Sequence, residues 1–319
     1  MKTIALAAAL ATLATKAAAD VQTRSVSFES AGSTISGTLY LPGGHDGARM
    51  PAVVVTGAWT TVKEQMPATY ARELAERGFA ALTFDFRGWG RSDDLSGGVR
   101  YREDPAEKTR DIRAAFDFAA TLPEMDATRI NGLGICASAG YTVDAAAGND
   151  RVARIGLVAP WLQNAEIVEA VYGGPEGVSA LIEIGRSAEA AGGEIIPAAG
   201  PEGTEGVLMP LDGYYVDPAR GAIPEYDNRW NQASWEGWLR YHPADGADRL
   251  TQPLAIVHSE AAAIPDGVRA FLNGFARDAT LRWLEDVTQF DFCDDPEAVT
   301  RAVETMAAHF GRAGDRTEG

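Results

Sequence analysis

Short apolar runs alternate with amphipathic helical stretches along most of the chain, and this rhythm constrains the fold more than any other feature. Runs such as PAVVVTG are typical of strands buried on both faces of a parallel sheet. The expected strands are 26–30 and 35–41, which form an antiparallel opening pair, followed by 51–57, 79–86, 129–135, 154–160, 253–259 and 281–286. The expected helices are 66–77, 105–122, 296–310 and two that begin near 139 and 266. The sequence therefore predicts an α/β fold with an eight-stranded, mostly parallel sheet flanked by helices.

The rhythm stops between Pro160 and Pro253, for about 90 residues, which is far longer than a connection in such a fold. We divide the chain into a core (20–160 and 246–319) and a lid inserted between the sixth and seventh strands (161–245). The lid is expected to contain a helix over 165–184, a stretch rich in glycine and proline over 191–218, and a cluster of large aromatic residues. These rings either line a pocket for an apolar or aromatic ligand or form the lid's own small core. The candidates for the pocket are Trp161, Trp230 and Trp235.

The first residues, MKTIALAAALATLATKAAAD, have the layout of a secretory signal peptide. A lysine is followed by an apolar stretch and by three small residues, so cleavage is expected after Ala19. The apolar stretch is too short to span a bilayer, and no other segment approaches that length. We expect a periplasmic or secreted protein with a signal peptide at 1–19 and no membrane span after cleavage.

The formal net charge of −17 becomes −19 when Lys2 and Lys16 leave with the signal peptide. Such a surface repels phosphate backbones and anionic lipids. A small-molecule substrate is therefore expected, with no nucleic acid as partner; the oligomeric state stays open, a homo-oligomer included. The two cysteines, Cys136 and Cys293, are too few for a disulfide scaffold, and we expect them to be unpaired.

The segment GLGICASAGY (132–141) has the small-residue spacing of a nucleophile elbow, in which a strand turns sharply into a helix. Either Cys136 or Ser138 fits this spacing. We favour Cys136 because the preceding strand ends at Ile135, whereas Ser138 would fall in the first helical turn and cap it. A helix N-terminus favours a thiolate, whose ordinary pKa is within reach of neutral pH, and the backbone N–H of Ala137 can stabilise an oxyanion. The alternative is an inert core cysteine.

With this motif the sequence resembles the α/β-hydrolase superfamily, and specifically its dienelactone-hydrolase-like branch, in which a cysteine can occupy the elbow. Two other segments carry the resemblance, VVVTGAWTTVKEQ (53–65) and FDFRGWGRS (84–92). The resemblance implies the α/β-hydrolase fold over nearly the whole mature chain. It also implies that the backbone N–H of Ala58 or Trp59 is the second donor of an oxyanion hole.

The partners that the resemblance implies for the nucleophile are missing. The family's aspartate falls on Ala262 and its histidine on Gln289, and a glutamine exchanges no proton near neutral pH. The best surviving candidates for proton transfer are His258 and Glu260, at the end of the seventh expected strand. His258 could instead be a structural histidine. No cofactor and no metal are expected at this site.

Two functions remain open. The first is a hydrolase of an ester, thioester or lactone with an apolar or aromatic acyl part, in which Cys136 attacks, Gln289 positions the acyl group or water, and His258 or Glu260 moves protons. The second is an altered member of the fold that binds a small apolar ligand or performs non-hydrolytic chemistry, which the residues at Ala262 and Gln289 favour. We rank the hydrolase first because the nucleophile and oxyanion elements are retained.

Overall fold

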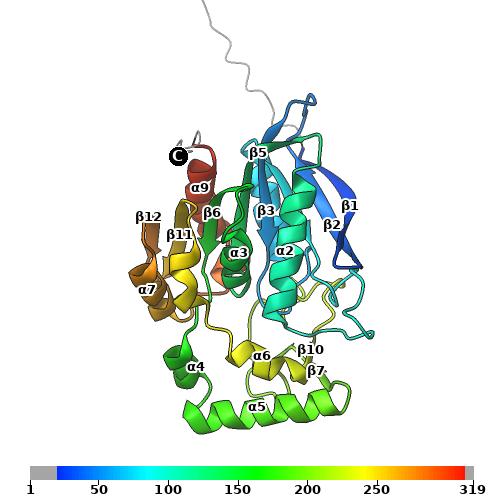
Figure 1. The fold of residues 1–319 in the computed structure, drawn as a ribbon, viewed down its shortest axis with the longest axis vertical. Helices are drawn as coiled ribbons and strands as arrows, with labels where there is room; N and C mark the ends of the chain where they lie inside the picture. Colours follow the sequence, from blue (N-terminus) through cyan, green and yellow to red (C-terminus); the bar gives the residue numbers. More distant parts are fainter. Residues whose placement is uncertain (1–19, 313–319) are drawn as a thin grey trace, which may run out of the picture.

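The computed structural model describes residues 20–312, which form a central sheet covered by helices on both faces (Figure 1). The strands of this sheet are β1 (Gln22–Ser30), β2 (Ser33–Leu41), β3 (Met50–Thr56), β4 (Ala80–Phe84), β5 (Met125–Ile135), β6 (Val152–Val158), β11 (Leu254–Ser259) and β12 (Ala279–Leu284). The flanking helices are α1 (Met66–Glu76), α2 (Pro105–Ala119), α3 (Ser138–Ala146), α7 (Pro265–Gly274), α8 (Asp291–Asp294) and α9 (Pro296–Phe310).

The strand order is β1-β2-β4-β3-β5-β6-β11-β12, and from β4 onward every neighbouring pair is parallel. Only β1 with β2 and β2 with β4 are antiparallel. The predicted eight-stranded, mostly parallel α/β fold is confirmed, and the expected core elements differ from the observed ones mainly at their ends. The signal peptide expected at 1–19 lies outside the described residues.

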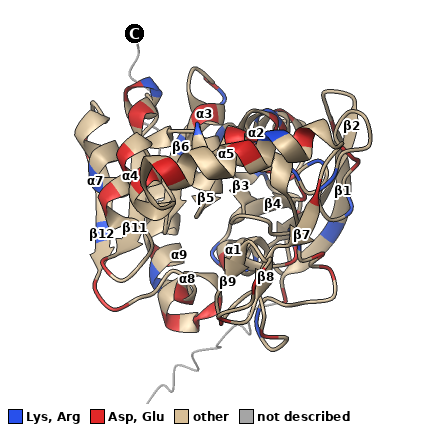
Figure 2. Cartoon of the chain, turned by 90° about the horizontal axis from the view of Figure 1, so that it is seen from below, with Lys and Arg blue, Asp and Glu red and all other residues tan. Residues whose placement is uncertain are grey.

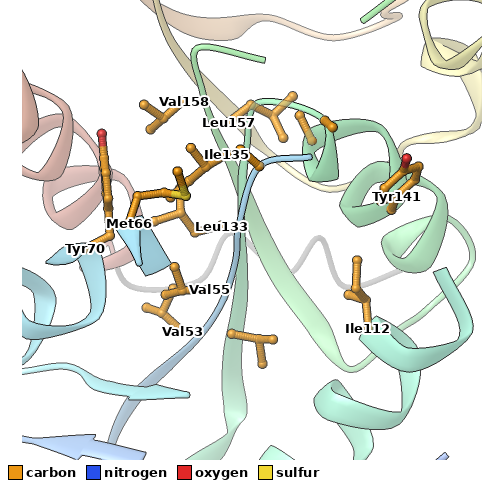
Figure 3. Close-up of a cluster of buried hydrophobic side chains, with 14 of the residues drawn as sticks. Val53, Val55, Met66, Tyr70, Ile112, Leu133, Ile135, Tyr141, Leu157 and Val158 are labelled. Carbon is orange, nitrogen blue, oxygen red and sulfur yellow. The ribbon is translucent and has the colours of Figure 1, made fainter. Parts of the chain in front are cut away.

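The middle of the sheet is buried on both faces, as its uninterrupted apolar runs predicted. Val53, Val55, Leu133 and Ile135 on β3 and β5 are at most 1% exposed. Figure 3 shows Met66 and Tyr70 of α1 on one side of these strands, and Ile112 of α2 and Tyr141 of α3 on the other. Two helical layers thus hold the ends of β3 and β5 in place, and these ends carry the candidate site.

Local sequence explains where the flanking helices begin. Asp104 precedes α2 and accepts hydrogen bonds from two backbone N–H groups of its first turn, and Pro105 occupies the first helical position. The same arrangement, with Asp295 and Pro296, begins α9. Each cap supplies acceptors for N–H groups that have no partner inside the helix.

The residues between β6 and β11 form a separate group of elements at one end of the sheet (Figure 1). We call residues 159–253 the insertion. It contains α4 (Ala165–Val171), α5 (Gly174–Ala190), β7 (Ile195–Pro197), β8 (Ala199–Gly200), β9 (Met209–Pro210), β10 (Arg229–Asn231), α6 (Trp235–Leu239) and two 3-10 helices, Gln232–Ser234 and Pro243–Arg249. The division of the chain into a core and a lid stays a prediction.

The prediction of a single helix over 165–184 was wrong, because this segment forms two helices. Gly173 and Gly174 have φ angles of 84° and 75°, in the left-handed region that glycine enters without steric cost. The chain therefore turns between α4 and α5, and α5 runs on to Ala190. Figure 1 shows α5 lying across the end of the molecule.

The end of the molecule that carries the insertion is acidic. Seen from that end, Figure 2 shows Asp and Glu residues on α4, α5 and α8. A charge of this sign disfavours the approach of anionic ligands from this side. Within residues 20–312, no helix has the length and apolar character that crossing a membrane requires.

Candidate active site

Cys136 lies at a sharp turn between β5 and α3. Its φ angle is +56°, a left-handed conformation that costs a non-glycine residue about 1–3 kcal/mol. Backbone hydrogen bonds hold it there: its N–H donates to Val158 O at 3.0 Å, and its carbonyl accepts from the N–H groups of Ala139 at 3.2 Å and Trp161 at 2.9 Å. A strained residue held in this way at a turn from a strand to a helix is typical of a nucleophile elbow.

The small residues of the motif are required by close packing. A Cβ atom at Gly134 would lie 2.7 Å from the Cα of Ala139, and one at Gly140 would lie 2.7 Å from the Cβ of Pro243. Both distances are shorter than van der Waals contact. Gly134 thus lets α3 cross close to β5, and Gly140 lets Pro243 of the insertion pack closely against α3.

Ser138, the other residue considered at the elbow, has a structural role. Its side chain is 1% exposed, and its Oγ accepts from Thr56 Oγ1 at 2.8 Å and donates to the Ile135 carbonyl at 3.1 Å. These bonds tie the first turn of α3 to β3 and β5. Ser138 lies in the first turn of α3, as the strand register predicted, but its side chain does not cap the helix as expected.

Three donors surround the sulfur of Cys136: the backbone N–H groups of Ala137 and Trp59 and the side-chain amide of Gln289. Of the two residues expected to supply the second backbone donor, Trp59 does so at the sulfur, while Ala58 lines the cavity beside it. Burial nevertheless raises the pKa of the Cys136 thiol to about 11, because the three hydrogen bonds do not offset the loss of water. The expectation of a thiolate near neutral pH was wrong.

Gln289 lies between β12 and α8, and both its side-chain oxygen and its side-chain nitrogen are hydrogen bonded to the backbone. Its Oε1 accepts from the N–H of Ala263 at 3.0 Å, and its Nε2 donates to the carbonyl of Ala159 at 2.9 Å. The amide is therefore held with its N–H side toward Cys136, and it can donate a hydrogen bond but cannot take a proton. Ala262, at the expected position of the acid, lines the cavity and offers no carboxylate.

His258 and Glu260 do not lie at the site, so the structure contradicts their expected role in proton transfer. The side chain of His258 is completely buried and packs edge-on against Trp283, with ring centroids 5.2 Å apart. Neither of its ring nitrogens has a hydrogen-bond partner in the described part of the chain, and it does not line the cavity. Glu260 points to the surface, where it pairs with Arg269 at 2.6 Å and accepts from Trp283 Nε1 at 3.0 Å.

The buried position of His258 has a consequence for stability. Burial lowers the pKa of its imidazole from 6.5 to about 4. Below pH 6.5 the imidazole therefore binds a proton in the unfolded chain but stays neutral in the folded chain. The unfolding free energy thus decreases as the pH falls, and it levels off near pH 4. The loss from this residue is about 3 kcal/mol.

We therefore expect the stability of His258→Phe to depend less on pH. Between neutral pH and pH 4.5, its unfolding free energy should fall by about 2–3 kcal/mol less than that of the original protein. Urea unfolding at both pH values measures this difference. His309, whose pKa is also lowered to about 4 by burial, is present in both proteins and cancels. Unfolding free energies that fall equally in the two proteins would show that His258 does not titrate in this way.

The carboxylate of Glu103, which sequence reasoning missed, is buried near the elbow and contributes to the raised pKa of Cys136. It accepts from Lys108 Nζ and from the hydroxyl of Tyr141, each at 2.8 Å. Lys108 in turn lies over the ring of Tyr141, with its Nζ 5.9 Å from the centroid. Because its oxygens are committed to this network, Glu103 does not replace the missing base.

The sulfur of Cys136 opens into a cavity of about 390 Å³. Its walls are mostly aliphatic and aromatic, and no Asp, Glu, Lys, Arg or His of residues 20–312 lines it. The lining comprises Ala58, Trp59, Ile135, Cys136, Ala137, Ala159, Trp161, Met209, Leu211, Tyr215, Trp238, Ala261, Ala262, Ala263, Thr288, Gln289, Phe290, Phe292 and Cys293. An uncharged apolar ligand matches such walls.

Of the tryptophans expected at the pocket, Trp161 lines the cavity, whereas Trp230 and Trp235 do not. The latter two pack against each other with ring centroids 4.6 Å apart, and Trp230 also contacts Trp59. These two rings belong to a small core of the insertion. This was the alternative to a pocket that the sequence left open for the aromatic cluster. Trp238, from the same cluster, reaches the cavity and lies over Trp59 at 4.8 Å.

Tyr215 and Cys293 also line the cavity, and the sequence offered no signal for either. Tyr215 lies outside every recognisable motif. Cys293 lies in α8, four residues after Gln289, and is 5% exposed. Both cysteines are unpaired, as expected.

The insertion also supports the loop that carries Trp59. Thr60, with a φ angle of +62°, is hydrogen bonded through its Oγ1 to the hydroxyl of Tyr226 at 3.0 Å. Gln65 Nε2 donates to the carbonyl of Gly221 at 2.7 Å. The position of the Trp59 N–H thus depends on contacts between the sheet and the insertion.

Comparisons with known proteins agree with this geometry. Residues 35–162 match the model of the Dienelactone hydrolase family. The chain is 29% identical over 290 residues to the uncharacterized protein YcjY of Escherichia coli K12, covering 87% of this chain and 94% of that one. It is 28% identical over 213 residues to a thiohydrolase of Eupenicillium brefeldianum, covering 61% of this chain and 64% of that one. The crystal structure of the protein PA2218 from Pseudomonas aeruginosa matches with a TM-score of 0.78 at 25% identity, over 92% of this chain and 94% of that one.

The parallel sheet, the strained elbow and these matches define an α/β-hydrolase fold. Over residues 35–162 the chain is similar to the dienelactone-hydrolase branch of this superfamily. That match supports a hydrolase that acts on ester-type bonds.

Proposed function

We propose that the protein cleaves an ester, thioester or lactone with Cys136 as its nucleophile. The observation that carries this proposal is the strained Cys136 at the floor of an apolar cavity, with the backbone N–H groups of Ala137 and Trp59 directed at the same point. A reactive side chain beside two such donors is the arrangement that acyl transfer requires.

In the proposed reaction the thiol of Cys136 adds to the substrate carbonyl. The oxyanion that forms is stabilised by the N–H groups of Ala137 and Trp59. The bond between the acyl carbon and the leaving group then breaks, and the leaving group takes the proton of the thiol. Water subsequently attacks the acyl group on Cys136, which releases the acid and restores the thiol. Gln289 donates a hydrogen bond at the reacting atoms and holds them in position.

The cavity supports an uncharged substrate with an apolar or aromatic acyl part. The described part of the chain places no ionic group on its lining to pair with a carboxylate or an ammonium group, and burying an unpaired charge is costly. A thioester fits best, because a thiol leaving group needs less help from an acid than an alcohol does. The name of the thiohydrolase relative supports the same class.

The raised pKa of Cys136 predicts an unusual pH dependence. Because attack requires the thiolate, the rate is expected to rise about tenfold for each pH unit from about 7 to about 10. A thiol paired with an imidazole would instead reach a plateau near neutral pH. The measurement is the rate of iodoacetamide labelling of Cys136, followed by peptide mass spectrometry, with a free low-molecular-weight thiol as control. A plateau below pH 8 would show that the thiol has a base the cavity does not reveal.

A second function is favoured by one observation: within residues 20–312, no carboxylate or imidazole lines the cavity beside a thiol of raised pKa. In that case the cavity binds a neutral apolar ligand and Cys136 does not react. Tight binding of a fluorescent apolar probe, together with labelling of Cys136 no faster than that of an unfolded cysteine, would favour this function over the hydrolase.

We also propose that the insertion acts as a lid and that the protein is exported. Trp161, Leu211, Tyr215 and Trp238 of the insertion line the cavity, which supports the first proposal. The layout of residues 1–19 supports the second. A mature protein that begins at Asp20 in the periplasmic fraction would agree with export, and an unprocessed chain in the cytoplasm would contradict it.

A further inference from the structure

The groups of the described residues that hydrogen bond to the sulfur of Cys136 are donors. They are the backbone N–H groups of Ala137 and Trp59 and the Nε2 of Gln289. The hydroxyl of Tyr215 adds a fourth donor to the same cavity. It has no hydrogen bond with any residue of 20–312, and burial raises its pKa, so it keeps its proton. The electrostatic influence of Cys136 on Tyr215 places the two side chains near each other.

Proton acceptors are missing from the same walls. No carboxylate and no imidazole of the described residues lines the cavity. Gln289 Oε1 already accepts from the N–H of Ala263, and the hydroxyl of Thr288 already donates to Asp291 at 2.7 Å. The cavity can therefore donate hydrogen bonds to a developing oxyanion, but its lining cannot remove a proton from a bound molecule.

This asymmetry affects the two halves of an acyl-transfer reaction differently. When Cys136 attacks a thioester, one sulfur replaces another, and the departing thiolate takes the proton that Cys136 gives up. The protein needs no base for that exchange. When water attacks the acyl group on Cys136, a proton must leave the water, and general-base help worth about 10²–10⁴-fold is absent.

A thiol acceptor does not meet this obstacle. With an ordinary pKa of about 8.5, a part of it is already thiolate near neutral pH, and a thiolate is the stronger nucleophile toward carbonyl carbon. The apolar walls also disfavour water relative to an organic thiol. The acyl group on Cys136 should thus pass to a thiol more readily than to water.

We propose that the protein is an acyltransferase between thiols, which moves a neutral apolar acyl group from a thioester to Cys136 and then to an acceptor thiol. This activity rests on the proposed function of Cys136. In the first step the bond between the acyl carbon and the donor sulfur breaks, and the bond to Cys136 forms. In the second step the acceptor thiolate attacks, the bond to Cys136 breaks, and Cys136 recovers the proton that the acceptor lost. No oxidation or reduction takes place.

The experiment measures how the acyl group is divided between a thiol and water. Purified protein is incubated with S-phenyl thiobenzoate at pH 8, with and without 2-mercaptoethanol, and the thiophenol, the benzoate and the new thioester are separated by chromatography. Rates in buffer without protein, and with the Cys136→Ala variant, are subtracted. The expected result is that thiophenol release rises with the acceptor concentration and that transfer exceeds hydrolysis by about tenfold or more.

Gln289→His supplies a base beside the acyl group and tests the physical reason directly. We expect this variant to lower the ratio of transfer to hydrolysis by about tenfold or more, because water becomes the better acceptor. Thiophenol release that does not depend on 2-mercaptoethanol, with benzoate as the sole product, would overturn the transferase and leave the hydrolase intact. If neither acceptor gives release beyond the Cys136→Ala variant, both the transferase and the proposed function are overturned.

Discussion

Replacing Cys136 with alanine is expected to lower the rate of cleavage of an aryl thioester by about 10²-fold or more. The change removes the only nucleophile at the strained turn and with it the covalent route. The N–H groups of Ala137 and Trp59 remain and retain only the stabilisation of an oxyanion. Thiophenol release by the purified variant, compared with buffer alone, measures the loss.

Ser138→Ala is the matched control for this change, because Ser138 is the other nucleophilic residue of the motif. Its hydroxyl is occupied by Thr56 and Ile135, so the variant should keep the rate within about twofold. It should lose about 1 kcal/mol of stability along with these hydrogen bonds. If Ser138→Ala abolishes cleavage while Cys136→Ala keeps it, the assignment of the nucleophile is reversed.

Restoring an imidazole at the site is expected to have the opposite effect. The double variant Gln289→His and Ala262→Asp should increase hydrolysis at pH 7 by about 10²–10⁴-fold, the usual contribution of a general base. Gln289 already directs its side chain at Cys136, and Ala262 lies on the lining of the same cavity. The carboxylate would orient the new imidazole and stabilise its charged form. The rate should then level off near neutral pH instead of rising up to the pKa of the isolated thiol.

Gln252→His is the matched control, since Gln252 is also a buried glutamine but binds the carbonyls of Ala146 and Asn149 and does not line this cavity. It should leave the rate of thioester cleavage unchanged. Circular dichroism and the unfolding midpoint verify that all variants are folded. A folded double variant that gains no hydrolysis at pH 7 would mean that the missing base is not what limits this protein.

The fold was predictable because each element has a strong local signal. An uninterrupted apolar run predicted the buried strand β3, and Asp104 with Pro105 explains where α2 begins. The elbow was predictable for the same reason, since Gly134 is needed where the backbones of β5 and α3 meet. In these cases the residues that determine the structure are neighbours in the sequence.

The roles of side chains were harder to predict because they depend on distant contacts. His258 stands at the end of a strand, as a catalytic residue would, but it faces Trp283 and not the cavity. Trp230 and Trp235 belong to the same aromatic cluster as Trp238, yet only Trp238 reaches the ligand space. The spacing of these residues in the sequence does not indicate which side chains face the cavity, because the packing of the insertion on the sheet determines it.

The pKa of Cys136 was misjudged for a related reason. The position at a helix N-terminus is visible in the sequence and favours a thiolate. The burial that raises the pKa to about 11 comes from side chains far along the chain, such as Trp238 and Phe290, which enclose the cavity. An elbow motif thus locates the thiol but does not determine its reactivity.

If Cys136 is the nucleophile, it carries the acyl group between the two steps, and the acyl group can be located on the protein. The protein is mixed with S-phenyl thiobenzoate without an acceptor thiol, quenched in acid, digested and mapped by mass spectrometry. We expect a benzoyl group on the peptide that contains Cys136, formed faster than the group is hydrolysed. Turnover without any benzoyl group on Cys136, or a benzoyl group on another residue such as Ser138 or Cys293, would contradict it.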